Sequence, residues 1–310
     1  MKLLLSKPRG FCAGVVRAIE IVERTLELWG APVYVKHEIV HNRHVVDRLK
    51  KMGAIFIEDL GDIPVGSRLI YSAHGVPPSV REEAKKRKLV EIDATCGLVT
   101  KVHSAAKRYA TRGYHIILIG HKNHVEIIGT AGEAPGATTI VESVDDVFRL
   151  PFAQKDKLFY ITQTTLSLDD VSDITEALIK RYPQVETLPS ASICYATTNR
   201  QMALREITHE TDLVLVVGDP QSSNSNRLRE VATKRGVPAY LINGENEIDR
   251  IWLAGVKTIG LTAGASTPED LVQRVIERLI EYGVTDVENV VYTTEDVVFQ
   301  IPKQLQLVAR

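Results

Sequence analysis

The sequence predicts an α/β fold made of three small units that share one order of strands and helices. Each of the three cysteines follows an apolar segment and precedes a helix-like pattern. Strand-like and helix-like segments alternate along the whole chain, which is typical of parallel sheets. A second polar position follows each cysteine after nearly the same interval. These pairs are Cys12 and His41, 29 residues apart, Cys96 and His124, 28 apart, and Cys194 and Ser222, 28 apart.

The first cysteine shows the pattern most clearly. After Cys12, apolar residues recur at i, i+4, i+7 and i+11, which is the spacing of one helix face. We therefore expect a helix that begins just after the cysteine, and the same arrangement after the other two. The residues on this face are Val15, Ile19, Val22 and Leu26.

A further polar position closes a strand-like run later in each unit. These positions are His74 in LIYSAHG, Thr164 in LFYITQTT and Ser266 in TIGLTAGAS. Because parallel strands end at one edge of a sheet, the polar loops of each unit should lie together. If the three units meet around an axis, all of these loops point into one cavity.

The low identity between the three segments indicates a structural repeat rather than a sequence array. We expect the first unit at residues 14–96 and the second at 97–193. The third unit would combine residues 1–13 with 194–281. Residues 282–310 contain the strand-like runs VVY and VVFQI, and we expect them to form a tail packed across the body.

Composition and charge exclude several classes of partner. The chain has 310 residues, of which 44% are hydrophobic and 25% charged, and its net charge is −1. Such a balance provides no field to attract nucleic acid or an anionic membrane, so any anion site must be local. No apolar run has the length of a membrane span, and no signal-peptide core is present. We expect a cytoplasmic protein with no nucleic-acid or membrane partner.

Three cysteines from three distant segments suit one compact metal centre. The close C-x2-C pairs of structural zinc sites are absent. An iron–sulfur cube normally takes four thiolates, so three would leave one iron open as a Lewis acid for substrate. A mononuclear zinc site remains an alternative, with three cysteines and one of His41, His74 and His124 as ligands.

The remaining loops offer groups for an anion and for a proton. Small side chains at a helix start, as in the SSNSN run from Ser222, can cradle phosphate oxygens, although they could equally form a solvated N-cap. Glu126 stands among apolar neighbours, which would raise its pKa and suit a proton donor. It could also serve as a helix N-terminal acid. Thr164 could cap a helix, bond the substrate, or do both.

Several motifs together resemble the LytB/IspH family of 4-hydroxy-3-methylbut-2-enyl diphosphate reductases. They run in order from residue 8 to residue 268 and so cover most of the chain. Each is weak alone, but their order is highly specific. The motifs are PRGFCAGV, HNRHVVDRL, SAHGV, DATCGLVTKVH, TQTTLS, ICYATTNRQ, SSNSNRL and TAGAS.

The resemblance implies a trefoil of three α/β domains around one central 4Fe–4S cluster. It also implies reduction of the allylic alcohol diphosphate to isopentenyl and dimethylallyl diphosphate, the last step of the non-mevalonate isoprenoid pathway. Glu126 would donate the proton, and Thr164 would help to fix the substrate hydroxyl. The implied cluster ligands are Cys12, Cys96 and Cys194, which leave one iron open, and the implied diphosphate ligands are His41, His74, His124, Ser222, Ser223, Asn224 and Ser266.

No dinucleotide-binding fingerprint is evident, so we expect ferredoxin or flavodoxin as the electron donor. The chain departs from the family pattern at Gly97 and Val125, where proline is common, and at Asp219–Pro220–Gln221. Two rival functions stay open: a non-redox iron–sulfur lyase of the quinolinate-synthase type, and a zinc- or iron-sensing protein without turnover.

Overall fold

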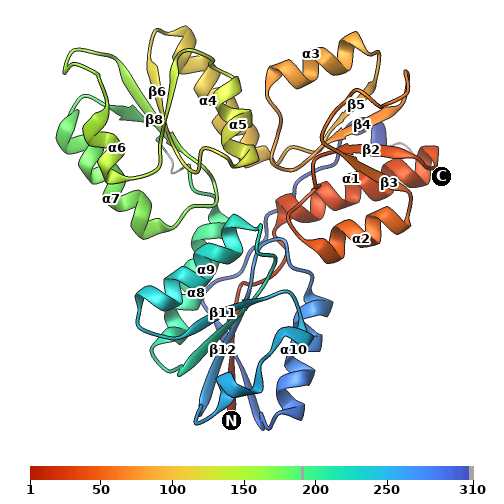
Figure 1. Ribbon diagram of the computed structural model, residues 1–310, viewed down its shortest axis with the longest axis vertical. Helices are drawn as coiled ribbons and strands as arrows, with labels where there is room; N and C mark the ends of the chain where they lie inside the picture. Colours follow the sequence, from red (N-terminus) through yellow and green to blue (C-terminus); the bar gives the residue numbers. More distant parts are fainter. Residues whose placement is uncertain (190–191, 307–310) are drawn as a thin grey trace. The chain divides into compact units, whose positions relative to one another are not determined.

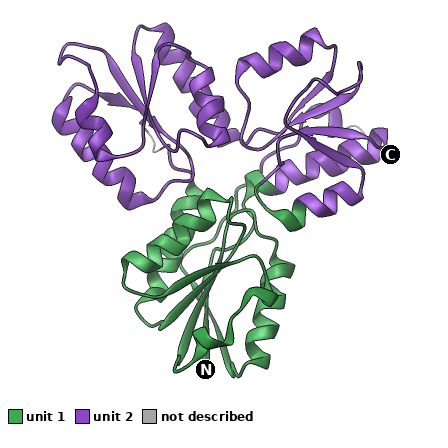
Figure 2. Ribbon diagram, viewed as in Figure 1, with its two compact units in different colours: residues 1–15, 41–45, 195–298 green, residues 16–40, 46–194, 299–310 purple. Residues whose placement is uncertain are grey.

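The computed structural model describes residues 1–189 and 192–306, and this part of the chain contains three sheets of parallel strands flanked by helices (Figure 1). The α/β class predicted from the alternating pattern is confirmed. The chain divides into two compact units (Figure 2). Unit 1 comprises Met1–Val15, His41–Val45 and Tyr195–Val298, and unit 2 comprises Val16–Val40, Val46–Cys194 and Phe299–Arg310.

Unit 1 contains one five-stranded sheet whose first strand comes from the start of the chain. Its strands are β1 (Lys2–Lys7), β10 (Leu213–Val217), β11 (Ala239–Ile242), β12 (Thr258–Ala263) and β13 (Asp286–Val291). Its helices are α8 (Tyr195–Thr208), α9 (Ser223–Lys234) and α10 (Glu269–Glu281), with short 3₁₀ turns η1 (Glu245–Glu247) and η2 (Arg250–Leu253).

Alternate residues of these strands point to opposite faces of the sheet, and each face has its own core. Leu3 and Leu5 pack with the apolar residues of α10. Leu4, between them, packs instead with α8 and α9. Both faces are thus covered by helices, which explains why the runs LLL and LVLVV read as continuously apolar.

Unit 2 contains two four-stranded sheets. The first has strands β2 (Val33–Lys36), β3 (Ala54–Ile57), β4 (Arg68–Tyr71) and β5 (Val90–Asp93), accompanied by α1 (Ala13–Trp29), α2 (Arg43–Lys51) and α3 (Pro78–Lys86). The second has strands β6 (His115–Ile119), β7 (Thr138–Val141), β8 (Leu158–Thr162) and β9 (Glu186–Thr187), with helices α4 (Gly97–Thr111), α5 (Val125–Gly132), α6 (Val144–Arg149) and α7 (Leu168–Arg181). A short helix, α11 (Lys303–Gln306), follows near the end of the described chain.

The three sheets repeat one strand order. It is β3-β2-β4-β5 in the first, β7-β6-β8-β9 in the second and β11-β10-β12-β1-β13 in the third. In each sheet, the strand that comes first along the chain (β2, β6 or β10) lies between the second and the third. The chain therefore winds in opposite directions on the two sides of that strand. The crevice at the carboxyl ends of two such strands is where doubly wound sheets bind ligands. The threefold repeat predicted from the cysteine spacing is therefore a repeat of topology.

The C-terminal segment contains a strand, and its packing as a tail across the body stays a prediction. Residues 286–291 form β13, which pairs with β1 along six register positions. This part of the segment is an edge strand of the sheet. Its residues are mostly exposed, and the strand-like run VVY contributes its last two residues. The run VVFQI at residues 297–301 is not a strand. The domain boundaries at 14–96, 97–193 and 194–281 stay a prediction.

No helix among residues 1–189 and 192–306 combines the length and the apolar character that crossing a membrane requires.

Candidate functional site

The predicted site residues lie at the carboxyl ends of the strands in both units. Unit 1 contains Cys12, His41, Ser222, Ser223, Asn224 and Ser266. Unit 2 contains His74, Cys96, His124, Glu126, Thr164 and Cys194.

Each cysteine is tied to the same place in its own sheet by a backbone hydrogen bond. The N–H of Cys96 donates to the carbonyl of Ala73, just before His74, at 3.0 Å. The N–H of Cys194 donates to the carbonyl of Thr164 at 3.0 Å, and the N–H of Cys12 donates to that of Ala265, just before Ser266, at 3.2 Å. The bond that positions each cysteine therefore also fixes the second polar loop of the same sheet.

The three thiols have the chemistry that an iron–sulfur cluster requires. All three are half-buried, and none forms a disulfide. Cys96 is the N-cap of α4 and makes no side-chain cap bond, and Cys12 and Cys194 directly precede α1 and α8. Helix N-termini favour negative charge and so favour the thiolate forms that bind iron. The donor set fits a cluster ligated by three cysteines.

Glu126 and Thr164 meet in the interior of unit 2. The carboxylate of Glu126 is 2% exposed and accepts the backbone N–H of Thr164 at 2.6 Å and its hydroxyl at 3.1 Å. Burial raises the pKa of Glu126 to about 7, although both bonds from Thr164 lower it. Glu126 is thus a carboxyl group that exchanges a proton near neutral pH, as its apolar surroundings predict.

Two predicted histidines of unit 2 lie next to each other. The rings of His74 and His124 have centroids 6.1 Å apart and meet edge to face. The Nδ1 atom of His124 accepts the N–H of Glu126 at 3.2 Å and thereby caps α5. Since Nδ1 is an acceptor, a neutral His124 carries its proton on Nε2 and can donate to an anionic oxygen.

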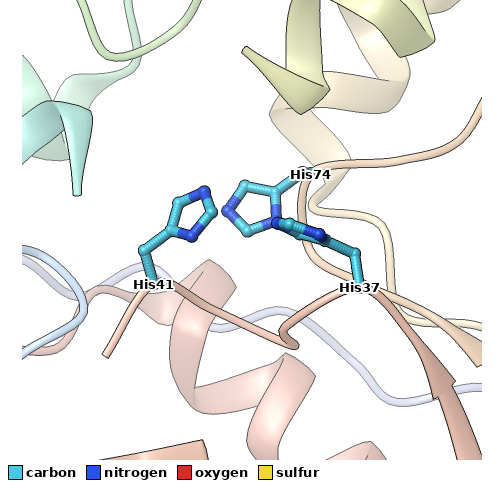
Figure 3. A group of neighbouring side chains, drawn as sticks. All are labelled: His37, His41 and His74. Atoms are coloured by element: carbon cyan, nitrogen blue, oxygen red, sulfur yellow. The ribbon is translucent and has the colours of Figure 1, made fainter. Parts of the chain in front are cut away.

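The sequence reasoning missed His37, which belongs to the same group. Its ring lies 5.9 Å from that of His74, again edge to face, and Figure 3 shows both side chains. Its Nδ1 atom lies 2.7 Å from the carboxylate of Glu58, which holds the ring in place. The available signal was a second histidine in the loop after the VYVK strand, four residues before His41.

The polar loops of unit 1 form a cradle at the start of α9. Ser222 caps the helix by accepting the N–H of Ser225 at 3.3 Å. Asn224 is 4% exposed, and its carbonyl oxygen accepts the N–H of Ala265 at 2.9 Å. Ser222, Ser223 and Asn224 thus lie beside the loop that contains Ser266. Hydroxyl groups, an amide and free N–H groups at a helix N-terminus suit a phosphate.

His41 joins this cradle through its backbone. The hydroxyl of Ser266 donates to the carbonyl of His41 at 2.8 Å. The carboxylate of Asp219 accepts the N–H groups of Arg43 at 3.1 Å and of Gln221 at 2.9 Å. The departure from the family pattern at Asp219–Pro220–Gln221 therefore supplies an acceptor that orders the loop before Ser222.

Similarity to known proteins agrees with this arrangement. The family model described as LytB protein matches residues 3–280. The 4-hydroxy-3-methylbut-2-enyl diphosphate reductase of Protochlamydia amoebophila is 76% identical over 98% of this chain and 97% of its own length. The protein of that name from Chlamydia pneumoniae is 64% identical over 98% of this chain and 99% of its own length.

The solved structure of the E-1-hydroxy-2-methyl-but-2-enyl-4-diphosphate reductase from Plasmodium falciparum has a TM-score of 0.96. It is 51% identical, and the match covers 99% of this chain and 96% of that one. A solved (E)-4-hydroxy-3-methyl-but-2-enyl diphosphate reductase matches with a TM-score of 0.65 and 32% identity, over 90% of this chain and 99% of that one. The fold class predicted from the motifs is confirmed, and the chain belongs to the LytB protein family.

Proposed function

We propose that this chain is a reductase that converts 4-hydroxy-3-methylbut-2-enyl diphosphate to isopentenyl and dimethylallyl diphosphate, the last step of the non-mevalonate isoprenoid pathway. The reaction adds two electrons and two protons to the allylic alcohol and releases its oxygen as water. One observation carries the proposal. This chain, which is 76% identical to a named reductase, buries the carboxyl group of Glu126 against Thr164, and the pKa of that carboxyl group is near 7.

The chemistry requires an electron carrier next to the substrate, and the three cysteines fit that need. Cys12, Cys96 and Cys194 would hold one 4Fe–4S cluster, with one iron that lacks a thiolate. When bound, the cluster supplies single electrons and a Lewis-acidic iron. Ferredoxin or flavodoxin would supply the electrons, since the chain lacks a dinucleotide fingerprint. Cysteines without a disulfide also agree with a reducing compartment, which we take to be the cytoplasm.

The diphosphate would bind to the polar loops. Neutral His124 can donate through Nε2, and His41 and His74 would add further donors. Ser222, Ser223, Asn224 and Ser266 would bind the phosphate oxygens through hydroxyl, amide and backbone N–H groups. Because these groups are fixed by the helix cap and by bonds between loops, they need little reorganisation when the substrate binds.

Glu126 would supply the proton that turns the leaving oxygen into water. Thr164 is suited to orient the substrate hydroxyl, because its own hydroxyl lies 3.1 Å from Oε2 of Glu126. A proton held at Oε2 can pass through the Thr164 hydroxyl to the substrate oxygen. With a pKa near 7, the carboxyl group gives up this proton readily and recovers it from solvent at neutral pH.

Anaerobic purification tests this function. We expect about four iron and four sulfide per chain, and oxidation of a reduced donor that depends strictly on the allylic diphosphate. Cys12→Ser, Cys96→Ser and Cys194→Ser should each lose the cluster and the activity. A full cluster without diphosphate-dependent oxidation would favour the lyase instead. Zinc without sulfide would favour a mononuclear site, and full activity in any serine variant would contradict the ligand assignment.

A further inference from the structure

Arg200 is a buried charged side chain that the proposed reaction does not use. It belongs to α8 in unit 1 and is fully buried. Its guanidinium donates to the carbonyl of Gly10 from Nε at 3.0 Å and from Nη2 at 2.7 Å, and to that of Phe11 at 3.3 Å. These two residues directly precede Cys12. Arg200 therefore holds the backbone from which the Cys12 thiol projects.

Glu295 is the acidic partner of this arginine. Its two oxygens accept from Nη1 of Arg200 at 3.1 and 3.2 Å, and one also accepts the amide of Asn199 at 3.0 Å. The Glu295 side chain is 13% exposed, whereas Thr294 and residues 296–298 around it are exposed. The carboxylate is thus the group that anchors this part of the C-terminal segment to α8.

The pair lies in the electrostatic surroundings of Cys12. The guanidinium of Arg200 donates to the carbonyls of the two residues before Cys12, and the carboxylate of Glu295 pairs with that guanidinium. Arg200 is fully buried and the Glu295 side chain is 13% exposed, so their charges are screened less than charges at the surface. Hydrogen bonds and net charge around an iron–sulfur cluster set its reduction potential.

We propose that Arg200 and Glu295 form a positioning pair, in which Arg200 fixes the loop of Cys12 and Glu295 offsets the charge that Arg200 brings to a cluster bound there. The inference rests on the proposed cluster ligation. Reduction adds negative charge to the cluster, so an arginine without its acidic partner would favour the reduced state. Glu295 would therefore keep the cluster a stronger reductant, although it is distant from Cys12 in the sequence.

The chain also offers conservative variants for a test. A cavity of about 490 Å³ is lined by Phe11, Arg200 and Glu295, so glutamine can replace Glu295 without crowding. Arg200→Lys keeps the charge but cannot reach two carbonyls through a planar fork. Glu288→Gln is the matched control, because Glu288 is an exposed acid on β13 that pairs with Lys2.

The measurements are the midpoint potential and the rate at which a chelator removes iron, both on the anaerobic full chain with its cluster. Glu295→Gln should shift the potential to more positive values, and Glu288→Gln should leave it unchanged. Arg200→Lys should lose iron about 10-fold faster than the parent chain. This factor is the lower end of the effect on metal affinity that follows when a residue that orients a metal ligand is replaced.

Wild-type potential in Glu295→Gln with a full cluster, or wild-type iron release in Arg200→Lys, would overturn the pairing while leaving the reductase function intact. If Glu295→Gln does not fold, Glu295→Asp retains the charge on a shorter side chain. It should then release iron faster with little change in potential, and unchanged release would overturn the inference. A parent chain that binds no cluster would instead refute the proposed function.

Discussion

The carboxylate of Glu126 accepts both the N–H and the hydroxyl of Thr164, at 2.6 and 3.1 Å. The two residues come from α5 and from the loop after β8, so the contact joins the two central loops of one sheet. The backbone of Thr164 in turn accepts the N–H of Cys194. The proposed proton donor, the substrate-orienting hydroxyl and a cluster ligand therefore form one hydrogen-bonded chain.

Glu126→Gln removes the proton and keeps the shape of the side chain. We expect cluster content and substrate affinity near those of the parent chain, while turnover falls by about 100-fold or more, which is the usual effect of losing a general acid. Turnover is measured by the anaerobic oxidation of a reduced donor, and substrate affinity is measured by titration with the substrate. Turnover close to that of the parent would remove Glu126 from the proton-donor role.

The pH dependence of turnover should follow the same group. Because burial places the pKa of Glu126 near 7, the fraction that holds a proton falls tenfold for each pH unit well above that value. We expect kcat/KM, which reports the protein without bound substrate, to decline along this slope above about pH 7, and the residual kcat/KM of Glu126→Gln to lack the slope. A parallel decline in both proteins would assign the titration to another group.

His103 should make the protein sensitive to acid. It lies on α4 and is 5% exposed, with Nδ1 3.2 Å from Glu133, while Nε2 has no hydrogen-bond partner within the described residues. Burial lowers the pKa of His103 to about 4, and the charge of Arg81 adds to this effect. The unfolded chain takes up this proton below about pH 6.5, before the folded one does.

The direction of this pH effect follows from the difference in proton binding between the folded and the unfolded chain. The stability that neutral His103 provides is complete above the unfolded pKa and is lost as the pH falls toward 4. Between pH 7 and pH 5 the loss should be about 2 kcal/mol in the free energy of unfolding. His103→Gln should weaken this pH dependence when unfolding is followed in urea. The same pH slope in both proteins would contradict the assignment to His103.

Gly75 packs directly on His103 and should not tolerate a side chain. Its φ is +78°, and an added Cβ would lie 2.8 Å from Cε1 of His103. Gly75→Ala should therefore destabilise the fold by about 2–4 kcal/mol, from backbone strain and overpacking together. It should also lower turnover, since the preceding residue is His74.

Gly66→Ala is the matched control, because Gly66 has a φ of +80° and nothing lies within 4 Å of its added Cβ. This variant should show only the backbone part, about 1–2 kcal/mol. Equal destabilisation of the two variants would mean that the contact with His103 costs nothing.

Asn224→Ala tests the anion cradle. The variant removes an amide at the start of α9 and leaves the N–H of Ala265 without its acceptor. If Asn224 binds the diphosphate as proposed, loss of that bond should raise KM about tenfold, with a smaller effect on kcat. Asn289→Ala is the control, because Asn289 lies on the exposed edge strand β13, and this variant should change neither KM nor kcat. An unchanged KM in Asn224→Ala would exclude this amide from substrate binding.

Much of the fold was readable because its signals are local. The interval between each cysteine and the next polar loop is nearly constant because one helix and one strand lie between them in each case: α1 and β2, α4 and β6, and α8 and β10. The carboxyl ends of strands are also recognisable from sequence, because apolar runs stop there. This is why Glu126 and Thr164 could be predicted as neighbours of one site.

Contacts between distant segments gave no such signal. Glu295 meets Arg200 across 95 residues, and neither residue has a distinctive local pattern. β13 is an exposed edge strand and lacks the buried alternation that identifies strands. Both features depend on tertiary pairing, which a single sequence does not reveal.

The pairing of β1 has a consequence for biogenesis. A ribosome makes residues 2–7 long before their neighbours in the sheet, which are residues 258–261 and 286–291. β1 therefore cannot pair with either neighbour until the long segment between β1 and β12 has been made. The bond from the N–H of Cys12 to the carbonyl of Ala265 likewise forms only after Ala265 has been made, so the proposed cluster ligation through all three thiols would follow the synthesis of that segment.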